Sequence, residues 1–313
     1  MLRHLFLFLF CFMSALVSMP VHANVTPVRV TASFSILADM VQQIGGEAVE
    51  VKTLVGAGQD SHHYEPSPQD AAKLADAEII AINGLHFEGW MGRLIEASGT
   101  NAKLLVAARG IVPRLLSEES AHHHHHDHDH DKAHRTEEPA YDPHAWQDLK
   151  NAAIYARNIA AALMEARPEY ASFFQDQAAA YIQKIEALDA KLKQDFAAIP
   201  EAQRKVVSNH DAFGYFSAAY GVRFYAPVGV NENTEPSAKD MAKLIQTIKD
   251  ENIHVLFVEN MSSPRLMKQL AKDTKARVGG VLYADALSPP QGPAPTYLDM
   301  MTHNAELILK GIR

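Results

Sequence analysis

A ten-residue segment of this chain occurs twice, and that repeat constrains the fold more than any other feature. Residues 65–74 read EPSPQDAAKL and residues 235–244 read EPSAKDMAKL, which are identical at seven of ten positions. In both copies a serine, an aspartate three residues later and the apolar residues that follow are typical of a helix start. The repeat therefore predicts that one structural unit is used twice.

The segments around the two copies agree in type and order. In the first unit we expect strands at 28–31, 49–55, 78–82 and 103–107 and a helix at 34–44; in the second, strands at 205–208, 222–228, 254–258 and 279–283 and a helix at 212–220. Strands that alternate with helices predict parallel sheets with helices on both faces. The fold class is therefore α/β, with two similar lobes and mostly parallel sheets.

A long helical stretch separates the two units. It is alanine-rich from Asp148 to Glu165, is interrupted near Pro168 and continues from Glu169 to Phe196. Its apolar residues recur at helical spacing, at Ile182, Ile185, Leu188 and Leu192. We expect an N-terminal lobe at 24–168, a connecting helix at 169–198 and a C-terminal lobe at 199–313. Because a helix is a stiff spacer, the lobes should move little relative to each other.

Residues 1–23 differ from the rest of the chain. Arg3 precedes an apolar run from Leu5 to Met13, and a small-residue site, Val21-His22-Ala23, follows. This pattern predicts a secretory signal peptide that is cleaved before Asn24. No later apolar stretch reaches the ~18 residues that a membrane-spanning helix needs, so we expect a soluble, exported mature protein.

Cysteine use and charge exclude several classes of protein. The single cysteine, Cys11, lies in the predicted signal peptide, so the mature chain has no disulfide and no thiolate ligand. No small residue precedes Cys11 in a way that suggests a lipid anchor. The formal net charge of −8 argues against nucleic acid as a partner, since phosphate binding needs clustered Lys and Arg.

The chain contains 17 histidines, and their placement is more informative than their number. Eight lie in an acidic low-complexity loop that we place at 117–141: His122, His123, His124, His125, His126, His128, His130 and His134. Nothing in such a tract can form a core. Dense imidazoles and carboxylates bind divalent transition metals, but nothing rigid orients them, so we expect weak, accessory metal binding.

A precise site should lie at the ends of ordered strands, because ligands bind outside the carboxyl ends of strands in open α/β sheets. His62, with His63 beside it, His210 and Asp285 follow expected strands, and His144 lies between the histidine tract and the next helix. His62, His144, His210 and Asp285 would supply two ligands from each lobe to the cleft between them. Three imidazoles and a carboxylate suit tetrahedral Zn²⁺, although Cu²⁺ would compete in vitro.

Several other residues are weaker candidates for a role at the metal site. Glu65, Asp142 and Asp211 are candidates for orienting the imidazole ligands. His86 could be an accessory ligand. We interpret the remaining ordered histidines and the two tryptophans as surface or core residues: His63, His254, His303, Trp90 and Trp146.

The motifs around the four candidate ligands resemble those of the ZnuA- and TroA-like substrate-binding proteins of ABC transporters. Residues 60–66, DSHHYEP, are similar to the family's D-x-H-x-[YF]-E-P motif, with His62 as the matched ligand. Residues 142–146, DPHAW, are similar to its D-P-H-x-W motif, and residues 208–215, SNHDAFGY, to its third ligand segment. Asp285 falls at the fourth. The resemblance covers essentially the whole mature chain.

The resemblance implies a periplasmic metal receptor with two lobes and a rigid connecting helix that feeds a membrane permease. From the donor set we expect it to capture Zn²⁺ for uptake, and we also expect a monomer without a lipid anchor. Manganese-type relatives have an acidic residue where His210 stands, so His210 favours zinc. Zinc members often carry an acidic His-rich loop before the second ligand, as here. Some also have a disulfide in the second lobe, which this chain cannot form.

Other functions stay open at this point. The same class includes Mn²⁺ and mixed-metal receptors. A zinc-storage protein would use the histidine tract alone. A zinc hydrolase would need an open coordination position and a general base, but neither H-E-x-x-H nor G-x-S-x-G occurs in the chain. We therefore expect no enzymatic activity.

Overall fold

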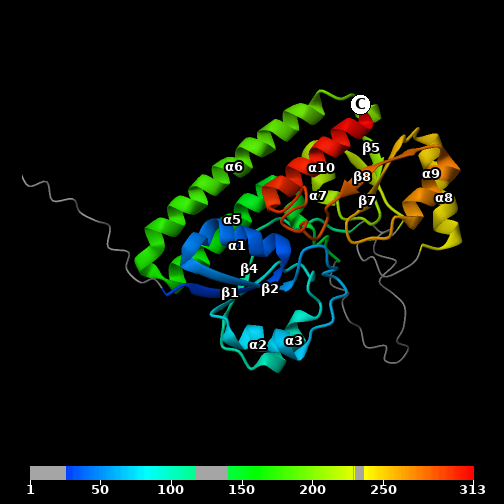
Figure 1. Ribbon diagram of the computed structural model, residues 1–313. Coiled ribbons are helices and arrows are strands. Elements are labelled where there is room, and N and C mark those ends of the chain that lie inside the picture. Colours follow the sequence, from blue (N-terminus) through cyan, green and yellow to red (C-terminus); the bar gives the residue numbers. More distant parts are fainter. Residues whose placement is uncertain (1–25, 117–139, 228, 230–235) are drawn as a thin grey trace, which may run out of the picture.

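The computed structural model describes residues 26–116, 140–227, 229 and 236–313. The predicted signal peptide and the eight histidines of the tract lie outside these residues. The described chain forms two α/β lobes with a layer of long helices packed along both of them (Figure 1). Within the described residues, no helix is long and apolar enough to cross a membrane.

In the described parts of the chain, each lobe has one sheet of four parallel strands, and the strand order is the same in both. The orders are β2-β1-β3-β4 and β6-β5-β7-β8. The strands are β1 (Val28–Phe34), β2 (Val49–Val55), β3 (Ile79–Ile82) and β4 (Lys103–Val106), then β5 (Lys205–Val207), β6 (Arg223–Tyr225), β7 (Val255–Glu259) and β8 (Arg277–Leu282). The prediction of two similar lobes with parallel sheets is confirmed.

Each expected strand overlaps an observed one; most ends differ by one or two residues, and β1 and β6 differ by more. β1 continues three residues beyond the expected end at Thr31, because it pairs with β2 and β3 on its two sides and is held as a central strand. β6 is only Arg223–Tyr225, because it is an edge strand that pairs with β5 alone, over three residues.

The repeated segment forms the same element in both lobes. It begins α2 (Pro68–Asp76) and α8 (Ala238–Asp250), and a serine caps each helix. Ser67 and Asp70 form a capping box, and the Ser237 side chain accepts a hydrogen bond from the Asp240 backbone N–H. With α3 (Met91–Ser98) and α9 (Arg265–Thr274), these helices lie on the outer side of their sheets (Figure 1).

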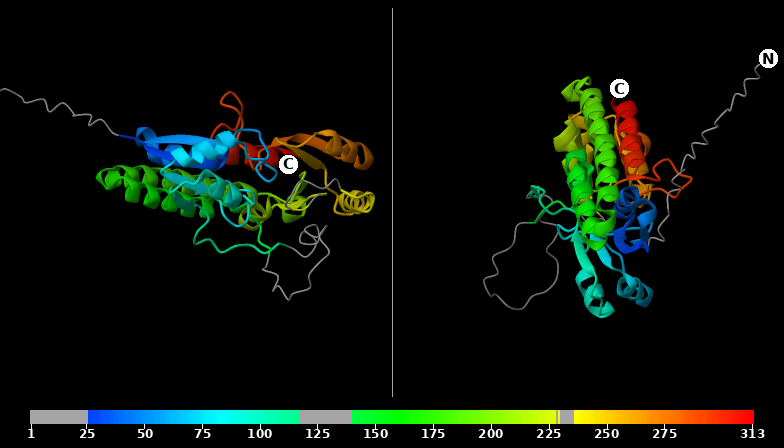
Figure 2. Two further views of the ribbon diagram at one scale, coloured as in Figure 1. Left: turned by 90° about the horizontal axis from the view of Figure 1, so that it is seen from below. Right: turned by 90° about the vertical axis from the view of Figure 1, so that its left-hand side faces the viewer.

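The inner layer of helices joins the lobes. It consists of α1 (Ser35–Gly45), α5 (Leu149–Ala166), α6 (Ala171–Ala197), α7 (Gly214–Tyr220) and α10 (Tyr297–Ile312). α6 would be about 40 Å long at the usual rise per residue. It contacts α1 and α5 in the first lobe and α7 and α10 in the second (Figures 1 and 2). α6 thus occupies the place of the expected connecting helix.

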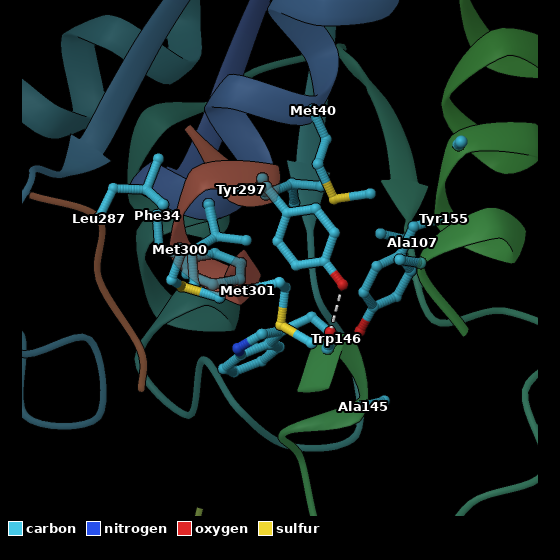
Figure 3. Close-up of a cluster of buried hydrophobic side chains, with 14 of the residues drawn as sticks. Phe34, Met40, Ala107, Ala145, Trp146, Tyr155, Leu287, Tyr297, Met300 and Met301 are labelled. Atoms are coloured by element: carbon cyan, nitrogen blue, oxygen red, sulfur yellow. Dashed lines mark hydrogen bonds between the residues drawn. The ribbon is translucent and has the colours of Figure 1, made fainter. Parts of the chain in front are cut away.

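One hydrophobic core runs through both lobes. It includes Phe34 and Met40 from the first lobe and Tyr297 and Met300 from α10, all buried around Trp146 (Figure 3). The Tyr297 hydroxyl donates a hydrogen bond of 2.6 Å to the backbone oxygen of Trp146. A smaller, separate cluster fills the space between the second sheet and α8 and α9. A shared apolar core of this extent opposes independent motion of the lobes.

Candidate metal site

Four side chains predicted as ligands meet in the interior between the lobes. One ligand atom from each of His62, His144, His210 and Asp285 lies within 4.8 Å of the others. The Nε2 atoms of His62 and His144 are 3.2 Å apart. Asp285 Oδ2 lies 3.3 Å from His62 Nε2 and 3.2 Å from His210 Nε2, and Asp285 Oδ1 lies 3.5 Å from His144 Nε2.

The fold explains three of these positions directly. His62, His210 and Asp285 lie in the loops after β2, β5 and β8, at the carboxyl ends of parallel strands. Among the described residues, no strand leads into His144. It precedes a single 3-10 turn, Ala145–Gln147, that leads into α5, and the shared core around Trp146 brings it to the others.

Asp285 is the centre of the cluster. Its side chain is fully buried, and neither carboxylate oxygen accepts a well-aligned hydrogen bond from the described residues. Burial raises the pKa of Asp285, but the neighbouring imidazoles of His144, His210 and His62 outweigh burial and hold the pKa well below its usual range. A buried carboxylate that lies against three imidazole nitrogens is suited to bind a cation.

Two of the imidazoles are oriented by carboxylates. His144 Nδ1 donates to Asp142 Oδ1 at 2.9 Å, and the same oxygen accepts the backbone N–H of His144. His210 Nδ1 donates to Glu259 Oε2. When Nδ1 carries the proton, the lone pair of Nε2 points to the centre of the cluster, as a metal ligand requires.

Glu259 is the functional residue that the sequence analysis missed. It is the last residue of β7 and is fully buried. Its Oε1 accepts the backbone N–H groups of Asn209 and His210, at 2.9 and 3.1 Å. The signal for it was an acidic residue at the end of an otherwise apolar strand, VLFVE, because such a carboxylate needs a partner at the sheet edge.

We expect Glu259→Gln and Asp142→Asn each to lower metal affinity about 10- to 100-fold. An amide can donate to Nδ1, which favours the tautomer with the proton on Nε2 and so blocks the ligand atom. Competition titration against a chelator measures the change. Asp76→Asn is the matched control, since Asp76 pairs with Lys52 on the surface; a loss of the same size there would argue against the orienting roles.

Both tryptophans anchor the loops that carry ligands. The indole N–H of Trp90 donates to the backbone oxygen of Ser61, next to His62. The indole N–H of Trp146 donates to the backbone oxygen of Ala284, next to Asp285, so it links the His144 loop to the opposite lobe. The prediction that both are core residues is confirmed, and their N–H groups add a positioning role.

The remaining candidates lie around the site rather than in it. Glu65 is exposed. His63 is half-buried and pairs with Asp60 at 2.7 Å, as a surface histidine. His254 is exposed, and His303 contacts the backbone oxygen of Val281.

His86 and Asp211 do not belong to the four-residue cluster either. His86 is exposed, in a turn with φ of 62°, so its side chain is not a fifth member. Asp211 lines a groove on the surface of the second lobe instead. Of the three residues proposed to orient ligands, Asp142 accepts a hydrogen bond from the His144 imidazole.

Comparison with known proteins agrees with this architecture. The family described as zinc-uptake complex component A, periplasmic, matches residues 30–311. The iron-binding protein YfeA of Yersinia pestis is 32% identical over 283 residues, which cover 90% of this chain and 86% of YfeA. The manganese ABC transporter substrate-binding lipoprotein PsaA of Streptococcus pneumoniae is 30% identical over 290 residues, which cover 91% and 88%.

Solved structures show the same fold. The periplasmic zinc-binding protein TroA of Treponema pallidum superposes with a TM-score of 0.81 at 28% identity, over 91% of this chain and 99% of that one. The Mn-bound periplasmic metal-binding protein of Candidatus Liberibacter asiaticus has a TM-score of 0.77 at 32% identity, with the same coverage.

Two parallel-sheet lobes packed around a buried cluster of imidazoles and a carboxylate define a metal receptor. The chain belongs to the ZnuA family, the metal-binding substrate-binding proteins of ABC transporters. It is thus an extracytoplasmic transport protein that works with a membrane permease, and not an enzyme. The expectations of a monomer and of no lipid anchor stay predictions, and PsaA is named a lipoprotein.

Proposed function

We propose that this protein captures Zn²⁺ in the periplasm with His62, His144, His210 and Asp285 and delivers it to an ABC permease for zinc uptake. The observation that carries the proposal is the spacing of the ligand atoms. In a tetrahedral site with Zn–N bonds of 2.0–2.1 Å, neighbouring ligand atoms are about 3.3–3.4 Å apart. Four contacts between these side chains are 3.2, 3.3, 3.2 and 3.5 Å, the last of them made by the other oxygen of Asp285. One ligand atom from each residue lies within 4.8 Å of the others, which is compact enough for all four to reach one ion.

The donor set supports zinc over manganese. Imidazole suits zinc, while carboxylate and water suit harder ions such as Mn²⁺. Three of the four donors are imidazoles. Receptors for Mn²⁺ or for several divalent metals remain the alternative, since relatives of similar identity are named for iron and manganese. In a zinc-storage protein, the histidine tract would bind the Zn²⁺ instead.

One titration experiment separates these functions. Residues 121–134 are deleted from the mature protein, and the metal-free variant is titrated calorimetrically with Zn²⁺ and with Mn²⁺. We expect the weak sites to disappear and one tight Zn²⁺ site to remain, with tighter binding of Zn²⁺ than of Mn²⁺. Loss of the tight site with the tract would show that the tract supplies a primary ligand, and preference for Mn²⁺ would favour the alternative receptor.

Zinc affinity should depend steeply on pH below neutrality. Burial lowers the pKa of His62, so its imidazole stays neutral at pH 7. Asp285 stays ionised well below pH 7. Because protons compete with Zn²⁺ for the imidazoles, and burial moves the protonation of His62 below the reference pKa of about 6.5, affinity should fall as the pH drops below that value. Chelator competition from pH 7.5 to 5.5 measures this. A flat profile would mean that carboxylates dominate binding.

A further inference from the structure

The segment that leads into His144 is held by the first turn of α7, which belongs to the opposite lobe. The buried side chain of Tyr215 donates a hydrogen bond of 3.2 Å from its hydroxyl to the backbone oxygen of Asp142. The same hydroxyl accepts the backbone N–H of Arg114 at 2.9 Å. One hydroxyl can make both bonds, because it has one donor and two acceptor positions. Since α7 begins shortly after His210, its first turn connects two of the ligand segments.

Arg114 and Asp142 are also joined to each other through their backbones. The N–H of Asp142 donates to the backbone oxygen of Arg114 at 2.9 Å, and Leu115 and Tyr141 form an antiparallel bridge beside them. The Arg114 guanidinium lies 5.6 Å from the centroid of the Tyr215 ring. Tyr215 therefore fixes a small hydrogen-bonded unit that contains the backbone of Asp142.

The two oxygens of the Asp142 carboxylate have different neighbours. Oδ1 accepts both the backbone N–H and the Nδ1–H of His144, at 2.9 Å each. Oδ2 lies against Gly214, the first residue of α7, and a Cβ atom added at Gly214 would be 2.5 Å from it. Such an overlap would force the carboxylate to move. Because the aspartate side chain is short, a movement of Oδ2 would also displace Oδ1 from His144.

We propose that Tyr215 and Gly214 are positioning residues for the metal site. Tyr215 holds the backbone of Asp142, and Gly214 leaves the space that its carboxylate needs to orient His144. Groups behind a metal-binding imidazole contribute to affinity because they set its tautomer and the direction of its ring. The inference rests on the proposed function, since the orientation of His144 matters for binding only if His144 is a ligand.

Tyr215→Phe tests the hydroxyl, because it keeps the ring and removes both hydrogen bonds. We expect Zn²⁺ affinity to fall about three- to tenfold, less than in Asp142→Asn, because the carboxylate is still present but less firmly held. Chelator competition on the mature protein at pH 7.5 measures the tight site. Tyr220→Phe is the matched control on the same helix, since the buried Tyr220 hydroxyl donates to Asp189 of α6 instead. An equal loss in both variants would overturn the role of Tyr215.

Gly214→Ala tests the space beside the carboxylate. The backbone of Gly214 has no positive φ, and alanine favours a helix more than glycine does, so the substitution causes no backbone strain. We expect Zn²⁺ affinity to fall about tenfold or more, because the added methyl group displaces Asp142. Gly92→Ala, on α3, is the matched control, since a Cβ atom there would meet none of the described atoms within 4 Å. Equal affinities of the two alanine variants would refute the role of Gly214.

A double-mutant cycle separates positioning from a general loss of stability. If Tyr215 acts through Asp142, adding Tyr215→Phe to Asp142→Asn should lower affinity by no more than about twofold further. Losses that multiply in full would overturn the proposal. Thermal melting of the metal-free variants checks folding, and if Gly214→Ala does not fold, the cycle decides.

The same titrations include His144→Ala, which tests the proposed function itself. Binding of Zn²⁺ by His144→Ala as tight as in the parent would overturn the ligand assignment and this inference with it. Weak binding by His144→Ala, together with unchanged binding by Tyr215→Phe and Gly214→Ala, would overturn the positioning roles alone.

Discussion

Replacement of His144 or His210 by alanine should lower zinc affinity about 100- to 1,000-fold. Structural zinc sites supply roughly 10–16 kcal/mol through four ligands, so the loss of one ligand removes about a quarter of that free energy. His62→Ala should behave in the same way. Chelator competition at pH 7.5 measures the affinity, with the histidine tract deleted so that weak sites do not obscure the result.

His63→Ala is the matched control, because His63 is adjacent to His62 but pairs with Asp60 outside the cluster. We expect its zinc affinity to stay within about threefold of the parent. Thermal melting of the metal-free variants checks that each is folded. Tight binding that persists in all three ligand variants would disprove the assignment, and a larger effect for His63 than for His62 would mean that the other histidine of the pair is the ligand.

Trp146→Ala should destabilise the metal-free protein by about 3–5 kcal/mol. The side chain is fully buried in the core shared by both lobes, where it packs against Phe34 and Phe87 with ring centroids 5.0 and 4.9 Å away. Truncation leaves a large cavity and removes the hydrogen bond to the Ala284 backbone oxygen. Urea denaturation followed by circular dichroism measures the change.

Two further substitutions separate packing from hydrogen bonding. Trp146→Phe keeps most of the apolar surface and loses the N–H donor, so its cost should be smaller, about 1–2 kcal/mol. Leu104→Ala, on a side chain that is 43% exposed, should change stability by less than about 0.5 kcal/mol. If Trp146→Ala were as mild as Leu104→Ala, the core around Trp146 could not be what holds the lobes together.

The sequence alone was sufficient to predict the lobes. Residues 65–74 and 235–244 carry the same helix-start signal, and the capped helices α2 and α8 form there because serine caps and apolar spacing act locally. The apolar runs that form β3 and β7 can also be recognised in the sequence, since buried parallel strands need continuous apolar residues. Their exact ends were less predictable, because pairing on one or two sides decides how far a strand extends.

The sequence also determined which residue types could bind a metal, and motif resemblance selected His62, His144, His210 and Asp285 from among many histidines and acids. The sequence did not determine how closely these four side chains approach one another. Spacing along the chain does not say that Asp285 Oδ2 lies 3.2 Å from His210 Nε2, and this distance depends on the packing of two separate lobes.

Only the tertiary structure identified Glu259 and the tryptophan anchors. Glu259 is 49 residues from His210 along the chain, and Trp146 is 138 residues from Ala284. Such contacts arise because α6, α10 and the shared core fix one lobe against the other. Local propensity and motif spacing act over a few residues, whereas the orientation of an imidazole depends on what the whole fold packs behind it.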